Sequence, residues 1–403
     1  MSRAYGAAVW RVGLVVLAVH LAWIGAFFGA GHEIRDFIKI GPLYVIGSDE
    51  SDVIRYDPTY SYPPNRDADT PGEGYDGQSS YYIALDPAEA PHYLDNPPYR
   101  YGRILYPITA RVLAAGQAEA IPYSLLAINV LAIVGATLAL AAWLSRRDIS
   151  PWFALVYGLF PGLLLALQRD LTEPLAYALV AVGVYLFDFG RRRGVLLAAG
   201  AFGLAALARE TTLIFPALFA ASILAGRPNA AGAAPDRATR RRRAGIFAAL
   251  ALAPAVVYGA FVWAWLGAPV AGEDTVSAIP FAGLLEGPWE LARQPPVLLF
   301  VALPALLCAA VALRGLGARE GMLERACLLA NVVVAVLLIG PAVWATYTSA
   351  GRVSAGVVLS ALLCLPYLLG ASMATRRVLA VACGLWLVVF PVVLAYGFLD
   401  TRI

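Results

Sequence analysis

The feature that most constrains this chain is a succession of long apolar runs, separated by short segments rich in arginine. About 20 apolar residues in a helix span the hydrocarbon core of a bilayer. Of the 403 residues, 60% are hydrophobic and only 14% are charged, whereas roughly a quarter of the residues of an ordinary soluble domain are charged. The sequence therefore predicts an all-α integral membrane protein with one transmembrane domain, residues 1–403.

The arginine clusters set the direction of each crossing, because basic residues concentrate in cytoplasmic loops. With these clusters inside, the chain makes about 11 crossings, and its N-terminus is cytoplasmic while its C-terminus is outside. The first apolar run, residues 12–28, is longer than the core of a typical signal peptide, so we expect a retained helix. The clusters are 146–147, 191–193, 240–243 and 376–377.

These crossings divide the chain into a long first external loop with amphipathic helices, residues 30–120, and two groups of membrane helices, 121–225 and 226–403. Lys39 is the only lysine, and with the richness in Ala, Gly and Leu this indicates a bacterial genome. We therefore expect the bacterial cytoplasmic (inner) membrane. The net charge of +3 is too small to indicate a nucleic-acid partner.

Nothing in the sequence predicts a cofactor or a metal centre. The four cysteines each lie inside an apolar run and form no CxxC pair, so they behave as small core residues. A divalent cation that bridges Asp76 and Asp170 is possible, but two carboxylates are too few ligands to predict one.

The external loop contains an acidic, aromatic and glycine-rich stretch at 72–82, which includes Asp76, Gln78 and Tyr81. Long polar connections in compact proteins are usually functional or disordered. Asp76 precedes a short helical stretch, so it is a candidate N-cap as well as a candidate catalytic base. The tyrosines suit either sugar stacking or anchoring at the membrane interface. An acidic cluster at 49–52 (Asp49, Glu50 and Asp52) is a rival source of the base.

Further along the loop, a capping Asp95 or Asn96 followed by Pro97 predicts the start of a helix. Arg100 and Arg103 lie three residues apart and share one face of that helix, opposite an apolar stripe. At the membrane surface such a pair is suited to a phosphate, held by bidentate hydrogen bonds. Binding of lipid headgroups is the alternative.

Charged residues also interrupt the apolar runs near the outer side. Asp170 and Glu173 follow one run, and Arg209 and Glu210 separate two runs too short to span a membrane fully. Ionisable residues at membrane depth are functional candidates, although Arg209 could instead form a structural bridge with Asp170 or Glu210. Arg352, in the last outer turn, is the remaining candidate among the charged residues near the outer side.

Over residues 10–225 this pattern resembles the GT-C fold of bacterial membrane glycosyltransferases. The likeness is carried by Tyr75-Asp76-Gly77-Gln78 after the first helix, by Tyr99 to Pro107 with its two arginines, by Asp170 to Pro174, and by Ala208 to Thr211. The chain departs from the family in lacking a pair of adjacent acids around position 76.

The resemblance implies transfer of a sugar from a polyprenyl-phosphate donor to a glycan, lipid or protein acceptor at the outer face, among membrane lipids. Asp76 would be the base of an inverting single displacement. Helices within 226–403 would form the groove for the donor lipid. The implied roles are donor-phosphate binding by Arg100, Arg103, Arg209 and Arg352, and acceptor or supporting contacts by Gln78, Tyr81, Asp170, Glu173 and Glu210. A transporter or lipid-linked-sugar flippase and a noncatalytic scaffold for envelope assembly are the alternatives.

Overall fold

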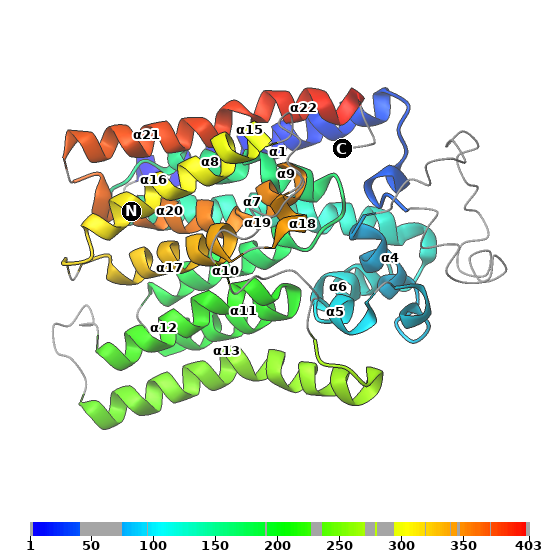
Figure 1. Cartoon of the computed structure of the whole chain (residues 1–403), viewed down its shortest axis with the longest axis horizontal. Coiled ribbons are helices and arrows are strands. Elements are labelled where there is room, and N and C mark those ends of the chain that lie inside the picture. The colour runs from blue at the N-terminus through cyan, green and yellow to red at the C-terminus, as the bar shows by residue number, and fades with distance from the viewer. Residues whose placement is uncertain are drawn as a thin grey trace.

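A computed structural model of the chain describes residues 3–40, 75–94, 96–189, 192–226, 236–270, 279, 294–318, 320–338, 340–344, 347–370 and 372–399. Every regular element in these ranges is a helix. Most of the long helices run along one common direction, and the short helices α4, α5 and α6 gather at one end (Figure 1). The all-α architecture is therefore confirmed.

The elements of the first half surround α10. They are α1 Arg3–Gly29, η1 Ile34–Phe37, α4 Gly77–Leu85, η2 Ala90–Tyr93, α5 Pro97–Tyr101, α6 Leu105–Leu113, η3 Ala118–Ala120, α7 Ile121–Ser145, η4 Pro151–Ala154, α8 Leu155–Gly158, α9 Pro161–Leu167, α10 Glu173–Phe187, α11 Arg192–Ala208, η5 Glu210–Leu213 and α12 Ile214–Ala225. Helix α10 packs against both α7 and α11, and α1 packs against α7.

The second half adds a peripheral helix and a second packed group. Its elements are α13 Arg237–Leu266, α15 Gln294–Val297, η6 Leu298–Ala302, α16 Leu303–Arg314, α17 Met322–Val332, η7 Val333–Leu337, α18 Pro341–Trp344, α19 Tyr347–Val353, α20 Ala355–Leu368, α21 Met373–Val388 and α22 Phe390–Leu399. Helix α17 packs on α20, α16 packs on α21, and α19 packs on α9.

Within the described ranges, five helical segments are long and apolar enough to cross a membrane: Gly6–Gly29, Ala118–Ser145, Arg237–Leu266, Pro295–Arg314 and Met373–Ala395. The pair α19 and α20, bent by 42°, makes a sixth if it is one span. The count of 11 crossings is not confirmed, because expected crossings such as Glu173–Phe187, Arg193–Ala208 and Glu210–Ala225 are shorter apolar helices. These features are those of a multi-pass membrane protein.

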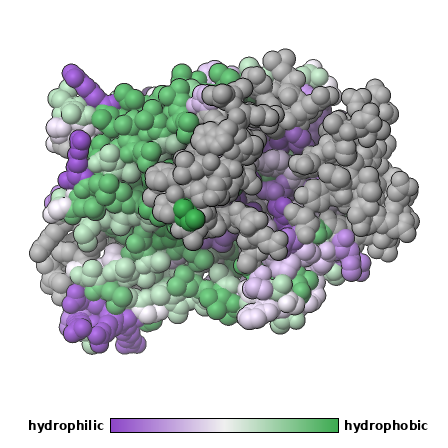
Figure 2. Space-filling view, in the orientation of Figure 1, coloured by the Kyte–Doolittle hydropathy of each residue, from purple (hydrophilic) through white to green (hydrophobic). Residues whose placement is uncertain are grey.

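The apolar surface of α13 shows how the outside of the bundle is made. Only 17% of the apolar stretch of α13 is buried inside the protein, compared with 61% of the stretch that contains α7. Helix α7 therefore belongs to the interior and α13 to the periphery. Val256, Val257 and Phe261 are all more than half exposed. Apolar side chains also cover much of the face shown in Figure 2. Such a surface suits contact with lipid tails.

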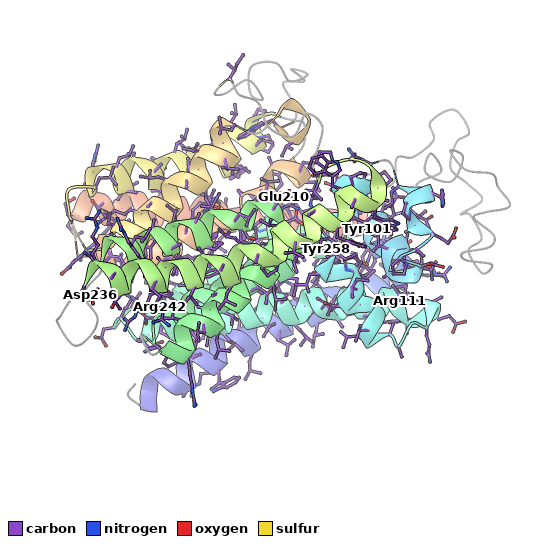
Figure 3. All side chains as sticks on the ribbon, turned by 90° about the horizontal axis from the view of Figure 1, so that it is seen from below. Tyr101, Arg111, Glu210, Asp236, Arg242 and Tyr258 are labelled. Atoms are coloured by element: carbon purple, nitrogen blue, oxygen red, sulfur yellow. The ribbon has the colours of Figure 1, made fainter. Side chains whose placement is uncertain are left out.

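The arginine cluster 240–243 and the helices α5 and α6 lie at opposite ends of the bundle. Figure 3 places Asp236 and Arg242 at one end of α13, and Tyr101 and Arg111 at the other. The arginine cluster 240–243 therefore lies at the opposite end from the helices of the first external loop. This separation agrees with the predicted sidedness, while the orientation in a membrane stays a prediction.

The external loop departs from expectation in one respect. The helix predicted to begin at Pro97 is two helices, because the chain turns between Tyr101 and Leu105. Asn96 caps the first of them, accepting a hydrogen bond from the Tyr99 N–H at 3.3 Å. The turn lets α6 pack onto α7, where Tyr106 donates a hydrogen bond to the carbonyl oxygen of Leu125 at 3.0 Å.

Candidate functional site

The position of Asp76 is set by a close backbone approach at the next residue. A Cβ atom on Gly77 would lie 2.0 Å from the carbonyl oxygen of Arg169, so only glycine fits there. The Tyr75 N–H also donates a hydrogen bond to the Lys39 carbonyl oxygen at 2.9 Å. The start of α4 is thereby held against the turn that leads into α10.

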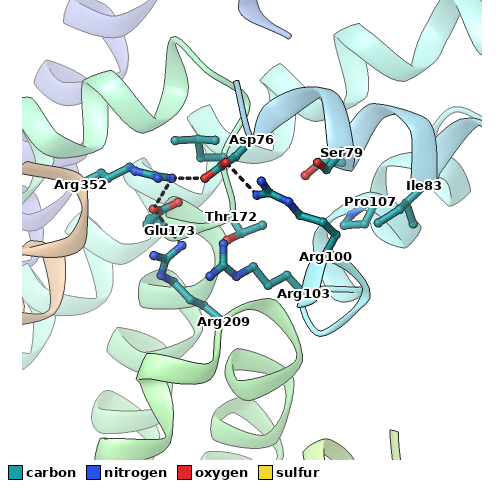
Figure 4. A pocket seen from close by; sticks show the side chains of 12 residues that line it. Asp76, Ser79, Ile83, Arg100, Arg103, Pro107, Thr172, Glu173, Arg209 and Arg352 are labelled. Carbon is teal, nitrogen blue, oxygen red and sulfur yellow. Dashed lines mark hydrogen bonds and ion pairs between the residues drawn. The ribbon is translucent and has the colours of Figure 1, made fainter. Parts of the chain in front are cut away.

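The Asp76 carboxylate pairs with two arginines from distant parts of the chain. Its Oδ1 lies 2.8 Å from Arg100 Nη1, and its Oδ2 lies 2.8 Å from Arg352 Nη1 (Figure 4). Asp76 does occupy the N-cap position of α4, but its side chain makes no capping hydrogen bond. The N-cap interpretation of its carboxylate is therefore wrong, because the guanidinium groups take both oxygens.

These pairs determine the acidity of Asp76. Burial raises the pKa of its carboxyl, but Arg352 and Arg100 oppose burial, and the net pKa lies well below its ordinary value. Asp76 is therefore ionised at neutral pH. A carboxylate with so low a pKa is a weak base for as long as both arginines remain bound to it.

Glu173 is the second carboxylate of the site, and it is fully buried at the first position of α10. Its Oε1 lies 2.9 Å from Arg209 Nη1 and 3.3 Å from Arg352 Nη1. Arg352 therefore connects Glu173 to Asp76. The structural partner of Arg209 is Glu173, rather than the Asp170 or Glu210 considered from the sequence.

The approach of α19 to α9 brings Arg352 into this cluster. A Cβ atom on Gly162 would lie 2.3 Å from the carbonyl oxygen of Gly351. The two helices therefore meet through glycine backbones, and the residue after Gly351 reaches the turn between α9 and α10. Tyr75 lies under the same guanidinium, whose carbon is 5.2 Å from the ring centroid.

Arg103 and Glu210 form a separate pair at the side of the cluster. Arg103 donates from Nε to Oε2 at 3.1 Å and from Nη2 to Oε1 at 2.8 Å. The Tyr99 ring lies 4.4 Å from the carbon of the same guanidinium and also accepts a hydrogen bond from it at the hydroxyl oxygen. The Arg103 side chain is 8% exposed and that of Glu210 is 46% exposed, so Arg103 stands between the cavity and solvent.

A small cavity, partly open to solvent, lies between these groups; its empty space is about 330 Å³ when the open solvent at its mouth is included. Asp76 lines it, together with all four arginines predicted to bind the donor phosphate and with Glu173. The full lining is Asp76, Ser79, Ser80, Ile83, Arg100, Arg103, Pro107, Leu171, Thr172, Glu173, Arg209 and Arg352. Residues from four distant segments thus converge on one polar cavity (Figure 4).

Four other predicted residues do not line the cavity. Gln78 and Tyr81 are buried in α4, each 1% exposed. Asp170 is also fully buried, at a φ of 48° in the turn between α9 and α10. Burial raises the pKa of its carboxyl well above the ordinary value, against the opposing effect of Tyr106. Glu210 borders the site only through Arg103.

Sequence reasoning missed six lining residues: Ser79, Ser80, Ile83, Pro107, Leu171 and Thr172. Ser79 and Ser80 lie one helical turn after Asp76, and Thr172 directly precedes Glu173. These three residues could have been found by looking for serine or threonine within four positions of a predicted charged site residue. Such residues are common beside caps, and that commoner role hides them.

The structure also bears on metal binding. Among the described residues, no group of three or more His, Cys, Asp or Glu side chains is placed to hold a metal ion. Asp76 lines the cavity whereas Asp170 does not, so the two carboxylates do not share it. The rival acidic cluster Asp49, Glu50 and Asp52 lies outside the described residues.

Comparison with known proteins adds no identity to this description. No family model, curated protein or solved structure matches the chain. The arrangement of the site is therefore the basis for its function: guanidinium groups suited to an anion, beside a carboxylate suited to accept a proton.

Proposed function

We propose that this chain is a membrane glycosyltransferase of the GT-C type. It moves a sugar from a polyprenyl-phosphate donor to an acceptor hydroxyl at the outer face of the bacterial cytoplasmic membrane. The observation that supports this most is the position of Asp76, between Arg100 and Arg352 in a polar cavity at one end of an apolar bundle. Polyprenyl-phosphate sugars combine an anion with a long apolar tail, and both parts find a suitable surface.

The reaction is a single displacement that inverts the anomeric carbon. Asp76 accepts the proton of the acceptor hydroxyl while the acceptor oxygen bonds to that carbon. The bond between the anomeric carbon and the phosphate oxygen breaks, and its electrons stay with the leaving polyprenyl phosphate. The arginines stabilise the negative charge that grows there. Asp76 then returns its proton to solvent.

Asp76 can act as the base in this reaction if donor binding weakens its ion pairs with Arg100 and Arg352. A phosphate that attracts Arg100 and Arg352 weakens their hold on the carboxylate, and its own negative charge acts in the same direction. Both effects raise the pKa of Asp76. The base thus becomes stronger when the donor is bound, and it stays inactive in the empty site.

The donor tail needs an apolar path that ends near the arginines. Helix α13 offers such a path, because Phe261, Trp263 and Trp265 are exposed near its C-terminal end. Trp265 packs edge-on against Tyr101, with ring centroids 5.1 Å apart. Tyr101 adjoins Arg100 in α5. This contact supports a lipid groove along the helices within 226–403. The proposal keeps the predicted sidedness, with the N-terminus in the cytoplasm and the site outside.

Replacement of Asp76 by asparagine tests the proposal in cells. At equal amounts of protein in the membrane, the glycan product of D76N should be lower than that of the wild type by about two to four orders of magnitude. The unreacted polyprenyl-phosphate sugar should accumulate, as measured by mass spectrometry of extracted lipids. Glu119→Gln is the matched control, since this exposed carboxylate lies outside the cavity.

A different pattern would favour the alternatives. A flippase depends on transport through the membrane rather than on a base, and a scaffold depends on neither. If D76N keeps full product formation in cells, and if purified protein transfers no sugar, the glycosyltransferase proposal is wrong.

A further inference from the structure

Three buried hydrogen-bond donors, one on each of three residues that line the cavity, have no acceptor among the residues that the structure describes. They are Thr172 Oγ1, Arg209 Nε and Arg352 Nε, and all three residues line the same cavity. An unpaired buried donor destabilises a protein, so most buried polar groups in proteins are satisfied. Three such donors around one cavity point to an acceptor that the site is built to receive.

The Thr172 hydroxyl lacks a partner because of the residues that follow it in the sequence. It is the N-cap residue of α10, where a threonine side chain usually accepts a hydrogen bond from the second or third N–H of the helix. Pro174 occupies the second position and has no N–H, and Thr172 makes no capping hydrogen bond. Its side chain, 6% exposed, therefore faces the cavity with an unused hydroxyl (Figure 4).

The position of this hydroxyl suits an anion. It stands at the N-terminus of a 15-residue helix, where the helix dipole is positive and attracts negative charge. The nearby Glu173 carboxylate is compensated by Arg209 and Arg352, which lie 2.9 and 3.3 Å from its Oε1. Each of these arginines still has an unpaired Nε.

The same wall carries one unpaired acceptor, Glu173 Oε2. An occupant that satisfies the whole wall must accept hydrogen bonds through an anionic group and donate one from a hydroxyl beside it. Sugar phosphates have this combination, since the phosphate adjoins a ring that carries hydroxyl groups.

We infer that Thr172, together with Arg209, Arg352 and the first turn of α10, forms the seat of the donor's phosphate, with the sugar directed toward Glu173. This inference rests on the proposed function for the nature of the donor. The Thr172 hydroxyl donates a hydrogen bond to a phosphate oxygen that is not bonded to carbon. That hydrogen bond strengthens as the sugar leaves, because negative charge accumulates on the phosphate.

Binding of farnesyl phosphate to purified protein tests the seat independently of sugar transfer. Titration calorimetry in detergent should show binding to the wild type and none of uncharged farnesol at the same concentrations. Thr172→Val keeps the shape of the side chain but removes the hydroxyl, and it should weaken binding about tenfold to a hundredfold. Thr172→Ser should retain most of the affinity.

Thr137→Val is the control for loss of a buried threonine hydroxyl, because Thr137 is also fully buried but donates to Ile133 within α7. Its affinity should equal that of the wild type. Equal affinities of wild type and T172V, or no binding of farnesyl phosphate by the wild type, would overturn the inference. Weaker binding by T172V in a protein that transfers no sugar keeps the seat and rejects the proposed function. Transfer with unchanged T172V affinity rejects the seat alone.

Discussion

Arg352 contacts Asp76 and Glu173 through one nitrogen, Nη1, at 2.8 and 3.3 Å. The two carboxylates belong to the external loop and to α10, whereas Arg352 belongs to α19, so this contact joins three parts of the chain. Its side chain is 11% exposed and that of Glu173 is not exposed at all. The cluster therefore depends on each partner being charged and in place.

Removal of this arginine should destabilise the protein. Arg352→Ala leaves two carboxylates with one cation fewer in a buried setting, and loss of a buried partner typically costs about 3–5 kcal/mol. Arg352→Lys should cost less because it keeps the charge. Chemical unfolding in detergent, followed by tryptophan fluorescence, measures both changes. Arg242→Ala, an exposed arginine at the other end, should change stability by no more than about 0.5 kcal/mol.

The ion pairs of Asp76 also predict how stability depends on pH. Its pKa is lowered in the folded protein by Arg352 and Arg100, which outweigh burial. Such a carboxyl stabilises the fold at pH values above its unfolded pKa of about 4. That contribution is lost as the pH falls through the folded pKa.

Accordingly, the stability difference between wild type and Asp76→Asn should be largest near neutral pH and should shrink below about pH 4. In Arg100→Gln one of the two cations is gone, so the folded pKa of Asp76 is lowered less. The decline should still begin near the unfolded pKa, but it should be smaller and should end at a higher pH than in the wild type. Thermal unfolding across the acid range measures both. A difference between wild type and D76N that stays constant down to the lowest accessible pH would show that Asp76 is not ion-paired.

Gly77→Ala should damage the site without removing any charged group. The new Cβ would lie 2.0 Å from the Arg169 carbonyl oxygen, which is backbone and has little room to move. Overpacking of this kind costs about 1–3 kcal/mol, and the displaced Asp76 should lose transfer activity. Gly135→Ala in α7, where nothing lies within 4 Å of the new atom, should be neutral or slightly stabilising. Similar behaviour of the two variants would contradict the close approach.

The pair Arg103 and Glu210 distinguishes a structural role from donor binding. Arg103→Glu should destabilise the protein, because two carboxylates then face each other where a bidentate pair stood. The reversed pair R103E/E210R should recover most of the lost stability. If Arg103 also holds the donor phosphate, the reversed pair should still bind farnesyl phosphate weakly. Recovery of both properties would assign Arg103 a structural role only.

Much of this arrangement could be predicted from local sequence. The group of membrane helices expected from residue 121 opens with α7, Ile121–Ser145, because a long apolar run has few alternatives to a membrane helix. The break at Arg209 falls where two apolar runs meet a charged residue, between α11 and η5. Asp76 and the four arginines were candidates because charge is expensive inside an apolar bundle.

The pairing of those charges could not be predicted. Any of several acids could pair with Arg209, and the choice of Glu173 depends on how α11 and η5 pack against α10. Arg352 reaches Asp76 only because Gly162 and Gly351 let two helices approach closely. These are long-range contacts, and a single sequence gives their residue types but not their distances.

The end of the bundle that carries the site should face the outside of the cell. Cysteine labelling tests this in a background with Cys383 replaced by alanine, since the other three native cysteines are buried. With a maleimide that cannot cross membranes, Glu119→Cys near the site should react in intact cells. Arg242→Cys, from the arginine cluster at the opposite end, should react only after permeabilisation. The reverse pattern would place the cavity in the cytoplasm, where soluble nucleotide sugars are the more accessible donors, and would remove the reason for a lipid-linked one.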